Sequence, residues 1–301
     1  MLSRRDIENE LGKGINIVPF HAKNLKENSI NLTIGQNAWT LGSNTIVKRT
    51  SGKYDIAKSA ERKNANVIEL KKGQSAIVGD KNNKYLILLP HTTTIIETSE
   101  VLSVSNRIGG TFHSKVGVVN QGIGDTSTML GPCFSGHLMF SLHNISDEVR
   151  TLKVGDTFVS LIFYYLNSPS SEMKNPNMSG HIDKLSEIGI QISKETREFL
   201  SEEWKQDIKQ VSYKMTESKE YKEYINMRKK ERKKEFVNYL SIRNIFLLTL
   251  GIGVVVCLAI GSYWLDQKYK TNVWSDRFWT VFVAGIFAPL VCVYGKLFRR
   301  K

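Results

Sequence analysis

The segment 109–144 (GGTFHSKVGVVNQGIGDTSTMLGPCFSGHLMFSLHN) constrains the fold more strongly than any other part of the chain. Near its end, apolar Leu138, Phe140 and Leu142 alternate with His137, Met139, Ser141 and His143. Such alternation predicts a half-buried antiparallel strand with one apolar and one polar face. The glycines before it and the DTST and GPCFSG stretches are typical of turns. The segment therefore predicts a small-molecule pocket on an all-β domain.

The rest of the first 166 residues reads as short strands separated by turns at regular spacing, which is typical of a β-sandwich or barrel. Ser3 and Asp6 predict a capped helix from Ser3 to about Leu11. The basic, polar stretch 49–66 is expected to be an exposed insertion. The expected β segments lie at 15–20, 24–35, 38–47, 67–70, 71–80, 84–90, 92–98, 149–152 and 157–166.

The chain changes character after residue 166. Residues 167–191 are rich in Ser, Pro and Asn over their first half and are expected to form a linker. Residues 192–242 are predicted to form an amphipathic, basic helical stalk. Its apolar stripe is Leu200, Trp204, Ile208, Val211 and Met215. Two explanations stay open for this stripe, which are packing on the β domain and self-association of the stalk.

Two apolar runs near the end, Ile245–Leu265 and Phe278–Tyr294, predict a transmembrane hairpin over 243–301. Much of the net charge of +13 lies beside these runs, in Arg228–Lys234 and in the tail 296–301. This placement favours anionic lipid head groups over nucleic acid as the partner. It also predicts an inner-membrane protein with both termini in the cytoplasm. The alternative is two buried helices of a globular domain.

Six motifs in the first 166 residues carry a family resemblance. In chain order they are MLSRRDIENEL, VPF, NSINLTIG, ETSEVLSVSNRIGGTFHSKVG, GPCFSGHLMFSLHN and LKVGDTFVSLIFYYL. Together they resemble the dCTP deaminase branch of the dUTPase-like family across Met1–Leu166. The resemblance implies a mainly β, distorted jelly-roll domain, followed here by the long amphipathic helix and two transmembrane helices. It also implies a homo-oligomer, with a trimer favoured, and nucleotide sites between subunits.

The resemblance does not carry the family's catalytic groups. The glutamate that activates water in the family falls at Ser141, and a hydroxyl is a poor general base near neutral pH. The family's arginine, serine and second arginine fall at Lys115, Val116 and Asn120, although one gap would place Ser114 at the serine. Two aspartate positions hold Gly131 and Asn31. The resemblance thus implies the fold and a nucleotide-shaped cleft, and no catalytic residue is assigned.

The binding residues predicted for a nucleotide share polar side chains or exposed backbone groups in the Gly-rich loop and turn. They are His113, Ser114, Lys115, Asn120, Gln121, Asp125, Thr126, Ser127, Thr128 and Ser141. The alternative is that the glycines only form turns and that Lys115 is solvated. No metal or other cofactor is expected, because His137 and His143 would be about 20 Å apart along a strand.

Three functions are compatible with the sequence. The first is a nucleotide-sensing membrane effector, in which a non-catalytic domain binds a nucleotide or cyclic nucleotide and controls a hairpin that disrupts the inner membrane. This architecture resembles bacterial anti-phage effectors. The second is a membrane-tethered active dCTP deaminase or dUTPase that depletes nucleotide pools, with Asp125 or Asp156 replacing the missing glutamate. The third is a scaffold that anchors a trimer.

Overall fold

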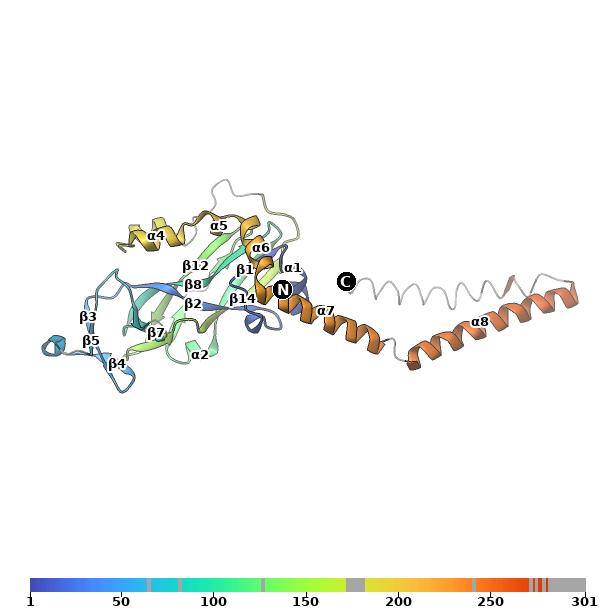
Figure 1. The fold of residues 1–301 in the computed structure, drawn as a ribbon, viewed down its shortest axis with the longest axis horizontal. Coiled ribbons are helices and arrows are strands. Elements are labelled where there is room, and N and C mark those ends of the chain that lie inside the picture. Colours follow the sequence, from blue (N-terminus) through green and yellow to red (C-terminus); the bar gives the residue numbers. More distant parts are fainter. Residues whose placement is uncertain are drawn as a thin grey trace. The chain divides into compact units, whose positions relative to one another are not determined.

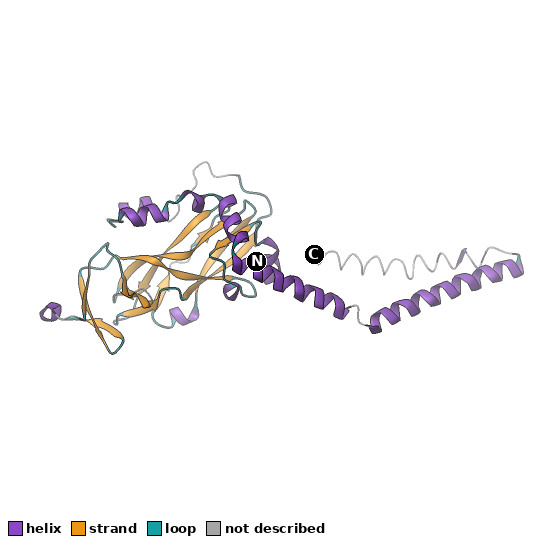
Figure 2. Ribbon diagram, in the orientation of Figure 1, coloured by secondary structure: helices purple, strands orange, loops and turns teal. Residues whose placement is uncertain are grey.

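The computed structural model describes residues 1–63, 66–80, 83–125, 128–171, 182–239, 242–270, 273, 276–277 and 280. The chain divides into two compact units, Met1–Ile225 and Asn226–Lys301. Figures 1 and 2 show that strands make up most of the first unit and that the described part of the second is helical.

The strands of the first unit begin early and continue to residue 165. They are β1 (Ile15–Val18), β2 (Ile30–Thr40), β3 (Thr45–Thr50), β4 (Lys53–Ile56), β5 (Val67–Leu70), β6 (Ile77–Asp80), β7 (Asn83–Leu88), β8 (Thr92–Val104), β9 (Ile108–Ser114), β10 (Ile123–Asp125), β11 (Met129–Leu130), β12 (Ser135–Asn144), β13 (Arg150–Lys153) and β14 (Thr157–Tyr165).

The helices lie mainly at the start and after residue 181. They are α1 (Arg4–Glu10), α2 (Val116–Val119), α3 (Ile182–Glu187), α4 (Lys194–Leu200), α5 (Glu203–Gln206), α6 (Ile208–Glu217), α7 (Lys219–Tyr239) and α8 (Ile242–Tyr269), with 3₁₀ turns η1 (Ala22–Asn24) and η2 (Ser59–Lys63). The predicted first helix is confirmed as α1. Ser3 caps it by accepting from the Asp6 N–H, and the Asp6 side chain accepts from the Ser3 N–H.

The main sheet has the strand order β10-β12-β8-β2-β14-β9-β11, with β1 beside β8. It curls so that its two ends enclose the core. Phe112 of β9 and Phe140 of β12 meet edge to face with ring centroids 5.0 Å apart, and Phe158 of β14 contacts Phe140 at 5.2 Å. The expectation of a mainly β domain with a curled sheet is confirmed.

Two smaller sheets flank the main one, with orders β13-β7-β6 and β4-β3-β5. The second of these contains part of the stretch that was expected to be an exposed insertion. Residues 53–56 pair with β3 as strand β4, and Tyr54 is buried beside Val47 and Leu70. The expected exposure holds for most of this stretch, since residues 49–53, 55–56 and 58–60 are exposed, whereas strand β4 was not predicted because its apolar signal is short.

The apolar stripe predicted to form one long stalk is divided among separate helices. Asp207 caps α6 by accepting from the Lys209 N–H, so the helix restarts there. Met215 is fully buried in the main core, and its sulfur accepts from the Ile17 N–H at 3.1 Å. Tyr224 donates to Glu8 at 2.7 Å. The stripe therefore packs on the β domain, as one of the two open explanations expected.

The stretch expected to be a linker also contains ordered structure at its end. Leu185 of α3 and Ile190 are buried, although both fall within the predicted linker 167–191. The linker prediction does not hold at this end, because Leu185 and Ile190 pack with Trp39 and Ile95 of the main sheet. The predicted linker residues 172–181 lie outside the described residues.

The second unit contains the residues of the predicted transmembrane hairpin, 243–301. Within the part of the chain that the structure describes, no helix meets the combined length and hydropathy needed to cross a membrane. The first predicted span, Ile245–Leu265, falls within α8. Of the second predicted span, Phe278–Tyr294, all but Thr280 lies outside the described residues.

Candidate functional site

Two of the predicted nucleotide-binding residues, His113 and Ser141, lie on outer faces of the curled sheet. The rings of Phe112 and Phe140 meet inside the core. Because side chains alternate along a strand, the next residues, His113 and Ser141, project away from that core on opposite sides of the domain. One copy of the chain therefore does not bring these two residues together.

The first group lies where β9 meets α2. His113 is exposed, and its Nε2 lies 3.2 Å from the Thr111 hydroxyl. Lys115 is half-buried, and its ammonium donates to the Thr157 hydroxyl at 2.6 Å. Ser114 is half-buried beside them. These side chains form a compact polar surface with one fixed cation.

The residues after Lys115 make local contacts. Asn120 is exposed at the end of α2, and Gln121 donates to the Gly117 carbonyl at 2.7 Å. Asp125 is paired with Leu142 at the edge formed by β10, next to the strand that carries Ser141. Thr128 is exposed and its carbonyl accepts from the Phe112 N–H at 3.2 Å, while Thr126 and Ser127 lie outside the described residues.

Ser141 stands on the outer face of β12, β8 and β2. It is half-buried and lies directly opposite Ile95 of β8, which in turn lies opposite Trp39 of β2. His143 shares this face and contacts the Thr93 hydroxyl through Nδ1 at 2.8 Å. The cross-strand row formed by Ser141, Ile95 and Trp39 therefore carries a hydroxyl beside apolar side chains, and it contains no carboxylate.

A buried carboxylate lies one rung away, on the same face, and the sequence-based predictions missed it. Glu97 is 1% exposed and pairs opposite Met139. Its Oε1 accepts from the Asn37 side chain at 2.7 Å and from the Gln36 and Asn37 N–H groups at 3.1 Å each. Oε2 has no hydrogen-bond partner among the described residues. Burial raises the pKa of this carboxyl to about 7, against the hydrogen bonds from Asn37.

The sequence does hold one signal for Glu97. Glu97 lies between Ile95 and Ser99 on the outward-facing side of β8. Because side chains alternate between faces along a strand, the sequence places this acid on the same face as the apolar Ile95. The other face of β8 is buried too, through Thr94, Ile96 and Thr98. The sequence of this strand therefore lacks the alternation of apolar and polar residues that would have marked Glu97 as a buried acid.

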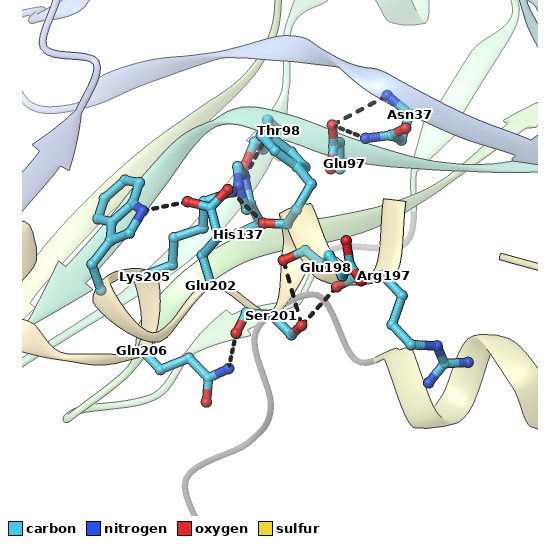
Figure 3. Close-up of polar contacts among 12 residues, drawn as sticks. Asn37, Glu97, Thr98, His137, Arg197, Glu198, Ser201, Glu202, Lys205 and Gln206 are labelled. Atoms are coloured by element: carbon cyan, nitrogen blue, oxygen red, sulfur yellow. Dashed lines mark hydrogen bonds and ion pairs between the residues drawn. The ribbon is translucent and has the colours of Figure 1, made fainter. Parts of the chain in front are cut away.

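Figure 3 shows polar side chains from α4, from α5 and from the turn between them near Glu97, Thr98 and His137 of the sheet. Lys205 of α5 is 2% exposed, and burial lowers its pKa. His137 of β12 is buried, and its Nδ1 lies 3.0 Å from the Thr98 carbonyl. Burial, and then the charge of Lys205, lower the pKa of His137 to about 4, so this imidazole is neutral near neutral pH.

The three histidines considered as metal ligands lie in separate surroundings. His137 is buried beneath α4 and α5, His143 pairs with Thr93, and His113 projects from the other outer face. Within the described ranges no group of His, Cys, Asp or Glu is placed to hold a metal ion.

Comparison with known proteins identifies the first unit. Residues 1–166 match the dCTP deaminase-like family. The dCTP deaminase of Ignicoccus hospitalis is 22% identical over 182 residues, covering 60% of this chain and 91% of that enzyme. The dCTP deaminase of Pyrococcus horikoshii is 25% identical over 117 residues, covering 37% of this chain and 75% of that enzyme.

Solved structures of low similarity include the 2'-deoxycytidine 5'-triphosphate deaminase of Agrobacterium tumefaciens. It has a TM-score of 0.37 and 11% identity, covering 54% of this chain and 45% of that one. A native EIAV dUTPase has a TM-score of 0.26 and 19% identity, covering 34% of this chain and 92% of that one. The chain thus spans less than half of the Agrobacterium enzyme. Because the family match extends over more than half of its residues, the protein belongs to the dCTP deaminase-like family.

Proposed function

We propose that this protein binds a nucleotide through its dCTP deaminase-like unit without deaminating it, and that binding controls the helices that follow. The observation that carries the proposal is the half-buried Ser141 hydroxyl at the position where the family resemblance expects a water-activating glutamate. A hydroxyl at its ordinary pKa cannot take the proton from water at a useful rate near neutral pH. Family membership supports a nucleotide as the ligand.

A homo-oligomer would complete the site. His113 and Lys115 lie on one outer face and Ser141 on the other, so a single copy offers a ligand only part of the predicted group. A second copy that presents its β9–α2 surface to the Ser141 face of the first would bring both parts to one ligand. This arrangement favours a closed ring of identical subunits, with a trimer as the proposal, because the contact is heterologous.

A thermal-shift screen of the full chain with dCTP, dUTP and a cyclic dinucleotide tests binding. A ligand that binds only the folded state at a hundred times its Kd stabilises it by about 2.7 kcal/mol and raises the melting temperature. Lys115→Gln is expected to weaken the shift, because a phosphate would lose its cation. Lys53→Gln, which removes an exposed lysine of β4, is the matched control. No shift with any of the three nucleotides would favour a scaffold instead.

The proposed effector role includes contact between the second unit and the inner membrane, with anti-phage defence as the proposed setting. Two observations support lipid as a partner. Lys229, Lys230, Lys233 and Lys234 are exposed on α7. The large apolar side chains Val256, Leu258, Ile260 and Trp264 of α8 are 49%, 57%, 64% and 59% exposed. Exposed apolar surface beside a basic run is the pattern of a lipid-binding segment.

Flotation of the full chain with vesicles tests this part. The protein is expected to float with vesicles that contain an anionic phospholipid and to float less with purely zwitterionic vesicles. Changing the four α7 lysines to glutamine is expected to weaken binding to anionic vesicles by about 1 kcal/mol per residue near the surface. Protein that stays at the bottom of the gradient with both vesicle types would contradict a membrane role.

A second candidate function is an active deaminase or dUTPase. The observation in its favour is Glu97, a carboxyl whose pKa of about 7 suits a general base. Against it stands the near-complete burial of Glu97, which keeps its carboxylate out of contact with solvent.

A further inference from the structure

Residues Lys184–Gln206, called the cover below, lie on the outer face that carries Ser141. Leu185, Ile190 and Leu200 of the cover pack with Trp39 and Ile95 in a cluster separate from the main core. Ile95 is the cross-strand neighbour of Ser141. The cover therefore occupies the surface that a ligand at Ser141 would need.

One hydrogen bond and one ring contact fix the end of the cover to β12. The Ser135 hydroxyl donates to the Lys205 carbonyl at 2.9 Å. The ring of Phe199 lies against the His137 ring, with centroids 5.3 Å apart, although Phe199 itself is 40% exposed. These contacts hold the C-terminal part of the cover at the start of β12, where the strand leaves the GPCFSG turn.

The cover also buries a charge that is only partly compensated. The Lys205 ammonium donates to the Phe199 carbonyl and lies 3.3 Å from the centroid of the Phe199 ring. The nearest ion-pair oxygen, Glu202 Oε1, is 3.8 Å away, beyond hydrogen-bonding distance. Glu97 interacts with Lys205 only electrostatically, and its Oε2 has no hydrogen-bond partner among the described residues. Burying the Lys205 ammonium with so few charged or hydrogen-bonding partners costs free energy. Lifting the cover would return the ammonium to water and so recover that free energy.

The cover is joined directly to the helices that lead out of the first unit. Gln206 ends α5 and Asp207 caps α6. Helix α6 packs on β1, where Met215 contacts Ile17, before α7 begins. A displacement of the cover thus pulls on α6 without any intervening linker.

We propose that the cover is a releasable, autoinhibitory strap, closed by Leu185, Ile190 and Leu200 and kept easy to lift by the buried Lys205 ammonium. Lifting it exposes the Ser141 face and shifts α6, so occupation of that face and the position of the exit helices are coupled. The identity of the ligand as a nucleotide rests on the proposed function, whereas the opening and closing of the strap do not.

The test measures how often the face under the cover is open. In the full chain, the three native cysteines are changed to serine, and Ile95→Cys places a thiol under the cover. Labelling of this thiol by a maleimide at pH 6.5 proceeds only from the open state, so its rate reports the fraction of open molecules. At this pH the Glu97 carboxyl is mostly protonated. Removing the positive charge of Lys205 therefore leaves little negative charge at Glu97 without a counter-charge.

Two variants are expected to move the rate in opposite directions. Leu200→Ala removes an apolar anchor that is 0% exposed and is expected to raise the rate about tenfold or more. Lys205→Met keeps the length of the side chain, removes the buried charge and is expected to lower the rate about fivefold. The matched controls, Ile188→Ala at a 46% exposed side chain and Lys209→Met at an exposed lysine, are expected to stay within about twofold of the parent.

Loss of folding cannot imitate this result, because an unfolded chain would label faster in both variants. A Lys205→Met rate equal to or above that of the parent would overturn the role of the buried charge. A Leu200→Ala rate equal to that of Ile188→Ala would overturn the strap itself. Added dCTP or dUTP is expected to change the labelling rate of the Ile95→Cys thiol, because a nucleotide on this face lifts the cover and lies beside residue 95. If the variants behave as expected and neither nucleotide has an effect, the strap stands and the proposed function fails.

Discussion

Replacing Phe140 with alanine is expected to lower the free energy of unfolding by about 3–5 kcal/mol. The ring is 3% exposed and contacts both Phe112 and Phe158, so it joins three strands of the curled sheet at the centre of the core. Truncation leaves a cavity that rigid neighbouring strands cannot fill. Urea unfolding followed by near-ultraviolet circular dichroism measures the loss.

The adjacent residue provides the control for Phe140→Ala. Ser141 points to the other face of β12 and is half-buried, so Ser141→Ala is expected to change the free energy of unfolding by less than about 1 kcal/mol. Equal losses for the two variants would contradict the assignment of Phe140 to the core face and Ser141 to the outer face.

Replacing Glu97 with glutamine is expected to change how stability depends on pH. The pKa of Glu97 is about 7 in the folded chain against an ordinary value of 4.5, so the folded state keeps a proton that the unfolded state has lost. The wild-type chain therefore loses stability from Glu97 as the pH rises from about 4.5 to 7. Glu97→Gln removes that loss, worth about 3 kcal/mol across the interval.

His137 acts in the opposite direction. Its pKa is about 4 in the folded chain against 6.5 ordinarily, so the unfolded state binds the extra proton between these values. Stability from His137 is present above about pH 6.5 and is lost as the pH falls toward 4. In the wild type the two groups largely cancel. In Glu97→Gln the rise due to His137 remains visible, at about 3 kcal/mol.

The comparison is made as the difference in unfolding free energy between wild type and variant at each pH, which removes the contribution of all other groups. Glu27→Gln makes the same change at an exposed glutamate and serves as the control. If the difference in unfolding free energy stays constant from pH 4.5 to 7, the pKa of Glu97 is not raised by burial in the folded chain.

Local sequence patterns predict the elements of this fold better than their packing. The alternation around Phe140 identifies strand and core face because both follow from a period of two residues. Ser3 and Asp6 likewise identify α1, since a cap needs only residues three apart. The docking of Leu200 on Ile95 joins positions about a hundred residues apart, and no periodicity encodes that register.

The candidate site shows the same division. The sequence identifies His113, Lys115 and Ser141 as polar groups near turns, whereas only the curled topology places them on opposite outer faces. Glu97 and Lys205 join one cluster only through the tertiary fold. In the second unit, the uncharged run Ile245–Leu265 predicted a membrane span, yet no described helix has the length and hydropathy to cross a bilayer.

The most direct test of binding without deamination combines calorimetry and product analysis on the same full-length preparation. Titration with dCTP is expected to give saturable heat, and incubation with dCTP is expected to give no dUTP and no ammonia. Enzymes of ordinary efficiency turn over about 1–1,000 times per second, so even a short incubation would reveal an active site. Stoichiometric binding with no product is the predicted result. Steady formation of dUTP would contradict the account, as would the absence of binding heat with dCTP, dUTP and a cyclic dinucleotide alike.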